Sequence, residues 1–151
     1  MPEQQIDIDY RIEGIELVEF HLEKKPSGEL PSKFHFDVHA NIRAHEEKQF
    51  TIAFIEIVVR EVDKKEQLAK IATATAFYVE NFKELEKNEK GVIVVPHVFG
   101  IHIRNLAISS TRGILYSYLK GTYLGKAVLP LVIDMIPTQN TPQEITDTIQ
   151  S

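Results

Sequence analysis

The stretch FHFDVHANIRAH, from Phe34 to His45, alternates apolar and polar residues without a break. Strict alternation is typical of a half-buried β-strand, because successive side chains on a strand point to opposite faces of the sheet. The apolar series, from Phe34 to Ala44, is therefore predicted to pack on a core. The polar series, from His35 to His45, is predicted to face water, as one side of an antiparallel sheet commonly does.

The polar series contains His35, Asp37 and His39, which raise the alternative of a metal site. Zinc holds nitrogen and oxygen ligands at about 2.0 to 2.2 Å, so the ligating atoms must converge. Residues two apart on a strand lie about 6.6 Å apart, whereas His35 and His39 would lie about 13 Å apart. A third ligand would have to come from another strand. We therefore expect this face to be solvated and free of metal.

Segments on both sides of this stretch also have strand character. Residues 6–12 and 15–23 alternate on either side of Gly14, which indicates one strand with a bulge. Residues 50–62 are apolar on both faces, which is typical of a central strand, and residues 68–82 are rich in β-branched and aromatic side chains. Short polar turns between these segments predict an antiparallel meander of four strands.

The pattern changes at Pro96. Apolar residues then recur at three- and four-residue spacing, which predicts a long helix over residues 96–120 that ends at Gly121. Residues 122–137 are mainly apolar and contain Pro130 and Pro137, which predicts an extended crossover segment after the helix.

The last residues carry a helix-start signal. Thr141 is followed by a proline, and Glu144 lies three positions after Thr141, so a capping box predicts a short C-terminal helix. The expected fold class is α+β, with a four-stranded antiparallel sheet, a long helix, an extended crossover and a short C-terminal helix. At 151 residues the chain is expected to form one domain over 1–151.

Composition narrows the classes of function. The chain has no cysteine, which excludes disulfides, thiolate zinc sites and cysteine nucleophiles. No apolar run is long enough to cross a bilayer, and the N-terminus lacks the pattern of a secretory signal. We therefore expect a cytoplasmic protein without membrane insertion.

Charge is distributed unevenly. The net charge is −5, and residues 1–23 hold seven acids against one arginine. Residues 91–133 hold no acid, and their bases are Arg104, Arg112, Lys120 and Lys126. Four scattered bases do not make a phosphate-binding track, so nucleic-acid binding is not expected. Charge complementarity with a partner or a client chain is the more natural use of this pattern.

The segment STRGILYSYLKGTYLGKAVLPLVIDM, residues 110–135, resembles the helix and crossover of SecB, the bacterial protein-export chaperone, and of SecB-like proteins. In that family a helix ends in a basic residue, glycine and threonine, and an apolar stretch with a proline follows. The matching residues are Lys120, Gly121 and Thr122, with Pro130 eight residues after the threonine.

The resemblance covers residues 6–136 and implies a function. It implies an ATP-independent chaperone, or holdase, that binds unfolded polypeptides or preproteins without a cofactor and acts in protein export as a homo-oligomer, a dimer or tetramer. The family's fourth strand usually carries a glutamate that engages the translocase motor, followed by paired glycines. Here Lys70 occupies that position without a glycine pair, and Tyr123 and Leu124 replace an aromatic-proline step. These departures weaken the expectation of contact with the motor.

Client contacts are expected near the crossover, where apolar side chains at strand and turn ends can line an open groove. The candidate client-binding residues are Tyr78, Tyr123, Leu124 and Leu129. The remaining apolar residues of the crossover, Val128, Leu131 and Ile133, are expected in the core.

A strip of small residues on the long helix is the candidate oligomer interface, because small side chains let another helix approach closely. Its members are Ser109, Ser110, Gly113 and Ser117. Symmetric self-association is a common fate of such surfaces.

The sequence leaves a second class of function open and argues against a third. An adaptor dedicated to a single partner, such as an antitoxin or one export substrate, differs from a general holdase in the breadth of its clients. An enzyme is not expected, because the sequence has no glycine-rich phosphate loop and no G-x-S-x-G motif, and Ser109 and Ser110 have no evident base.

Overall fold

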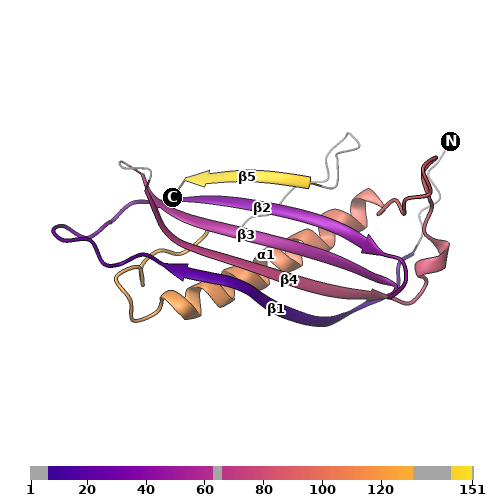
Figure 1. Cartoon of the computed structure of the whole chain (residues 1–151), viewed down its shortest axis with the longest axis horizontal. Coiled ribbons are helices and arrows are strands. Elements are labelled where there is room, and N and C mark those ends of the chain that lie inside the picture. The colour runs from indigo at the N-terminus through magenta and orange to yellow at the C-terminus, as the bar shows by residue number, and fades with distance from the viewer. Residues whose placement is uncertain (1–6, 63–65, 131–143, 151) are drawn as a thin grey trace.

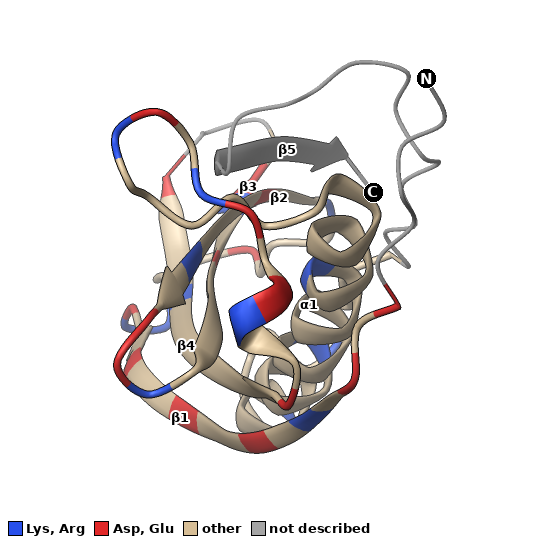
Figure 2. Ribbon diagram, turned by 90° about the vertical axis from the view of Figure 1, so that its right-hand side faces the viewer, with Lys and Arg blue, Asp and Glu red and all other residues tan. Residues whose placement is uncertain are grey.

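The computed structural model describes residues 7–62, 66–130 and 144–150. One long helix crosses one face of an antiparallel sheet, and the described residues place no helix on the other face (Figures 1 and 2). The sheet and helix are formed by β1 (Tyr10–Leu22), β2 (Phe34–His45), β3 (Phe50–Glu61), β4 (Gln67–Val79), α1 (His97–Leu119) and β5 (Glu144–Gln150). The α+β class and the long helix are thus as expected from the sequence.

The order of the strands is β1-β4-β3-β2-β5. Strands β2, β3 and β4 form a meander, but β1 pairs with β4 and not with β2, so the expected four-strand meander is wrong for β1. The connection over residues 23–33 contains Pro26, Gly28 and Pro31 and can extend roughly 35 Å. Crossing three strand spacings requires only about 14 Å, so this loop can carry the chain from β1 past two strands to β2.

The alternating pattern places the core as predicted. The apolar residues of β2 from Phe34 to Ile42 are all 5% exposed or less. They pack with apolar residues of α1 such as Ile103 and Leu115, so the core lies between the sheet and the helix. A hydrogen bond of 2.7 Å between the Thr73 and Thr111 hydroxyls also joins β4 to α1.

The bulge predicted at Gly14 is confirmed. The pairing of β1 with β4 shifts between Ile12 and Gly14, and it shifts again between Leu17 and Glu19. These two irregularities re-aim the side chains along β1 and leave several apolar residues of this edge strand exposed.

The expectation of a short C-terminal helix is wrong, because residues 144–150 form strand β5, which pairs antiparallel with β2. The segment ITDTI, residues 145–149, contains four β-branched residues, which favour a strand over a helix. The edge of β2 also offers unpaired backbone groups that a helix could not satisfy. Thr141, the proposed cap, lies outside the described residues.

The start of the crossover is a series of turns, so the expectation of an extended segment is wrong for residues 122–126. Gly121 ends α1 in the left-handed region with φ of 81°. The Thr122 hydroxyl then donates to the Leu119 carbonyl at 2.7 Å, and the Ala127 amide donates to the Leu124 carbonyl at 2.9 Å. The first of these bonds satisfies a carbonyl group that the helix end exposes, and the second closes a turn further along the crossover. Residues 131–135 of the crossover lie outside the described residues.

Candidate functional site

The four candidate client residues do not lie together. Leu124 is 0% exposed and Leu129 is 2% exposed, so the expectation that these two line an open groove is wrong. The turns after Gly121 direct both leucines into the core. Val128, which was expected in the core, is 42% exposed, whereas Leu131 and Ile133 lie outside the described residues.

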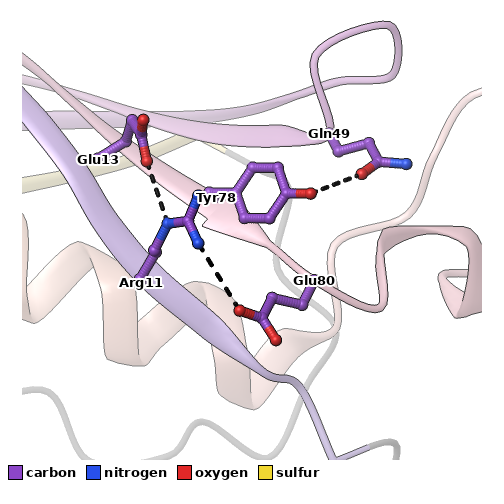
Figure 3. A network of polar contacts seen from close by, with 5 residues as sticks. All are labelled: Arg11, Glu13, Gln49, Tyr78 and Glu80. Carbon is purple, nitrogen blue, oxygen red and sulfur yellow. Dashed lines mark hydrogen bonds and ion pairs between the residues drawn. The ribbon is translucent and has the colours of Figure 1, made fainter.

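Tyr78 lies on the face of the sheet opposite α1, near the end of β4. Its ring faces the Arg11 guanidinium at 4.5 Å, and its hydroxyl donates to the Gln49 side chain at 3.1 Å. Glu13 and Glu80 in turn pair with Arg11 at 3.3 and 3.8 Å (Figure 3). The arginine thus covers one face of the ring, and cation–π contacts of this kind hold both partners in place.

Tyr123 lies at the other end of β1 and on the helix side. Its hydroxyl donates to the Glu23 carbonyl at 2.9 Å, just past the end of β1. The same corner holds Phe20 of β1 and Tyr118 of α1, whose ring centroids are 4.7 Å apart. We call Phe20, Tyr118 and Tyr123 the aromatic corner. Tyr123 therefore lies at the same end of β1 as the Phe20–Tyr118 pair, and Tyr78 lies near the opposite end of β1.

The aromatic corner is partly open to solvent. Tyr118 is 46% exposed, and Phe20 and Tyr123 are half-buried against the core. Burial raises the pKa of Tyr123, and the nearby Glu23 carboxylate raises it further. The phenol therefore stays neutral near pH 7 and keeps its proton for the bond to Glu23. Sequence patterns missed Phe20 and Tyr118, because no spacing within one element shows that β1 and α1 meet here.

A second apolar surface lies along the edge strand. Ile12, Ile15 and Leu17 pair with Phe77, Thr75 and Thr73, which places their side chains on the helix side of the sheet. They are 39% to 50% exposed, because α1 packs over β2, β3 and β4. We call Ile12, Ile15 and Leu17 the apolar ledge.

Side chains join β1 to α1 at both ends of the apolar ledge. Tyr10 hydrogen-bonds His102 at one end, and Phe20 stacks on Tyr118 at the other. The small-residue strip runs along α1 between these two points. Ser109, Gly113 and Ser117 of the strip are exposed, whereas Ser110 is half-buried and donates to the Leu106 carbonyl at 3.0 Å.

Lys70 lies on the helix-free face between two carboxylates, 3.4 Å from Glu19 and 3.5 Å from Glu56. The charges of Glu56 and Glu19 raise the pKa of Lys70. Lys70 thus offsets one of the two negative charges of Glu19 and Glu56. Beside this group is a shallow depression of about 270 Å³ whose lining includes Val18, Phe54 and Ala72.

The polar series of β2 is organised around Asp37. His35 Nε2 lies 3.0 Å from one carboxylate oxygen of Asp37, and Arg60 donates to the other oxygen at 2.8 Å. The positive charge of the Arg60 guanidinium at this distance would repel a metal ion bound at Asp37. The described residues contain no group of three His, Asp, Glu or Cys side chains that could hold a metal ion.

The metal-free character of this face stays a prediction. Titration of the purified protein with zinc in a calorimeter is expected to show no stoichiometric binding. Submicromolar binding that disappears in the double variant His35→Ala and His39→Ala would contradict it.

Stability is expected to depend on Asp37 in acid. Burial alone would raise the pKa of Asp37, but hydrogen bonds and charge from Arg60 and His35 outweigh it and lower the pKa below 3.8. A lowered pKa in the folded state stabilises the protein above the unfolded pKa, and this contribution is lost as the pH falls through the folded pKa. In urea titrations from pH 7 to pH 2, Asp37→Asn is expected to lower the free energy of unfolding at pH 7 and to flatten its decline below pH 4. An unchanged slope below pH 4 would contradict the assignment.

The fold and the polar network define an α+β protein with the architecture of SecB-like chaperones. Among solved structures, the Mycobacterium tuberculosis Rv1957 SecB-like chaperone in complex with a ChAD peptide from the Rv1956 HigA1 antitoxin is similar, with a TM-score of 0.57. The match covers 82% of this chain and 89% of that chain at 13% sequence identity, so the two share a fold. No protein-family model and no curated protein matches this sequence. No helix among the described residues is long and apolar enough to cross a membrane.

Proposed function

We propose that this protein is an ATP-independent holdase that binds unfolded polypeptide at the aromatic corner. The observation that carries the proposal is the position of Tyr118 and Phe20, whose rings are in tilted contact at a partly open corner between β1 and α1. Aromatic rings offer large apolar contact areas with little conformational entropy to lose. A surface of this kind suits clients of varied sequence, because it makes few directional demands.

The structural neighbour supports this proposal, since its structure contains a bound peptide from an antitoxin. A protein of this fold can therefore bind a polypeptide segment. We propose that this chain does so without a cofactor and without catalysing a reaction.

The test is aggregation of unfolded clients in the absence of nucleotide. Purified protein is expected to suppress the light scattering of several unrelated, chemically unfolded proteins as they are diluted from denaturant. Failure to slow the aggregation of any of them would refute the holdase.

The antitoxin peptide of the neighbour favours a second candidate, an adaptor for a single partner such as an antitoxin or one export substrate. An adaptor would bind one partner and leave the unrelated clients to aggregate. The same scattering experiment therefore separates the two functions by the breadth of clients held.

We also place the protein in the cytoplasm, where a holdase meets preproteins before their export. A direct contact with the translocase motor is the weakest part of this proposal. Lys70 occupies the position where the family usually presents an acid, and it offsets one of the two negative charges of Glu19 and Glu56.

We expect the protein to be a homo-oligomer, a dimer or a tetramer, with the apolar ledge and the small-residue strip at an interface. The ledge exposes apolar area on an edge strand, and the small-residue strip exposes a part of α1 that a second helix can approach closely. The double variant Ile15→Glu and Gly113→Glu is expected to reduce the mass measured by light scattering to that of a monomer. A monomer mass for the unmodified protein at tens of micromolar would refute this expectation.

A further inference from the structure

We infer that the aromatic corner prefers polypeptide segments that carry acidic side chains next to apolar ones. This inference rests on the proposed function and adds the charge of the client. It follows from the placement of four lysines around the corner in a protein whose net charge is −5.

Two of the lysines come from the acid-free stretch over residues 91–133. The two arginines of this stretch are less accessible to a client, because Arg104 is buried and Arg112 is partly buried and donates to the Leu129 carbonyl. Lys120 and Lys126 remain, and both are exposed. They lie on either side of Tyr123 in the sequence, and neither forms an ion pair within the described part of the chain.

The other two lysines come from a distant part of the sequence. Lys24 and Lys25 directly follow Glu23, whose carbonyl accepts the Tyr123 hydroxyl at 2.9 Å. Both are exposed, and no ion pair joins either of them to another described residue. The end of β1 and the turns after α1 lie at the same end of the molecule in Figure 1. The loop after β1 and the turns after α1 thus each bring two lysines to this end of the molecule.

The acids near the corner do not cancel this charge. Glu23 is the closest, and its carboxylate lies 2.7 Å from His21 Nε2. Glu19 points to the opposite face of the sheet, where it pairs with Lys70. Glu29 lies further along the loop, beyond Pro26 and Gly28. Glu66 is exposed and directly precedes β4, whose Leu68 carbonyl accepts the Glu23 amide at 2.9 Å, so it also lies at this end of the sheet. The four lysines thus stand against Glu23, Glu29 and Glu66, and a client with carboxylates would complement the positive charge that remains.

The test compares two fluorescently labelled synthetic peptides with the same phenylalanines and leucines, one interleaved with aspartate and the other with lysine. The acidic peptide is expected to bind about tenfold more tightly at low salt, because each exposed ion pair contributes little and several act together. The ratio of the affinities for the acidic and the basic peptide should fall toward one as salt is added.

Two matched pairs of charge variants test whether the preference for the acidic peptide comes from the lysines near the aromatic corner. Lys24→Glu with Lys126→Glu is expected to abolish or reverse the preference, with an unchanged thermal melt. Lys83→Glu with Lys90→Glu changes the net charge equally at exposed positions after β4, and it is expected to keep the preference. Equal affinities in the unmodified protein, tighter binding of the basic peptide, or equal loss of preference in both variants would overturn the inference.

The same titrations separate this inference from the holdase itself. If unfolded clients are held but the peptides show no preference for acid, only the charge inference fails. If neither peptide binds and no client is held, the proposed function fails as well.

Discussion

Leu124→Asp is expected to unfold the protein. Leu124 is 0% exposed and belongs to the core between the sheet and the end of α1. The substitution removes the buried leucine contacts and places a carboxylate where it has no partner, a loss of more than about 5 kcal/mol. This approaches the whole stability of an ordinary domain, which is about 5 to 15 kcal/mol. A circular dichroism melt at pH 7 is expected to show no cooperative transition.

Val128→Asp is the matched control, since it introduces the same charge four residues away at a side chain that is 42% exposed. Its melt is expected to stay close to that of the unmodified protein. A cooperative melt for Leu124→Asp at an unchanged temperature would show that Leu124 is exposed and would restore it as a candidate for client contact.

Tyr118→Ala with Tyr123→Ala is expected to abolish most client holding while the protein stays folded. Truncation of an aromatic anchor typically loses about 2 kcal/mol or more of binding. Two truncations are therefore expected to weaken binding of an unfolded client by about a hundredfold or more. The measurement is the Kd for a labelled, permanently unfolded client, together with the thermal melt of the variant.

Tyr116→Ala provides the control for this double variant. Tyr116 and Tyr118 are 48% and 46% exposed, yet they lie about 200° apart around the helix, so only Tyr118 meets Phe20. Tyr116→Ala is expected to leave the Kd within about twofold. Equal weakening by Tyr116→Ala, or undiminished binding by the double variant with an intact melt, would contradict the assignment of the site.

The local elements could be predicted because their periodicity is strong. The alternation from Phe34 to His45 predicted β2 and its buried face, and the helical spacing after Pro96 predicted α1 to within a residue at each end. Gly14 likewise predicted a bulge in β1. Each of these features depends on the periodicity of side chains within a single strand or helix, which the sequence shows directly.

The two elements that the sequence predicts wrongly, β1 and β5, depend on interactions between distant segments. Nothing within β1 shows that it pairs with β4, because that choice depends on the reach of the loop over residues 23–33. Residues 144–150 carry both a helix-start signal and β-branched residues, and the edge of β2 decides between them. Tertiary context of this kind routinely overrides local propensity.

The candidate client-binding residues also divide into those that the sequence identifies and those that depend on contacts between distant segments. Tyr123 was identified from its place in the crossover, but Leu124 was grouped with it because an apolar run does not reveal which side chains turn inward. The hydrogen bonds after Gly121 make that choice. Phe20 and Tyr118 were missed because their contact joins residues far apart in the sequence.

Photo-crosslinking tests most directly whether clients bind at the aromatic corner. A photoreactive analogue of phenylalanine is placed at Tyr118 in one sample and at Phe54 in another, where Phe54 is 40% exposed on the helix-free face of the sheet. After mixing with a labelled unfolded client and illumination, the account predicts strong adducts from position 118 and only background from position 54. Adducts of equal yield at both positions, or from position 54 alone, would contradict it.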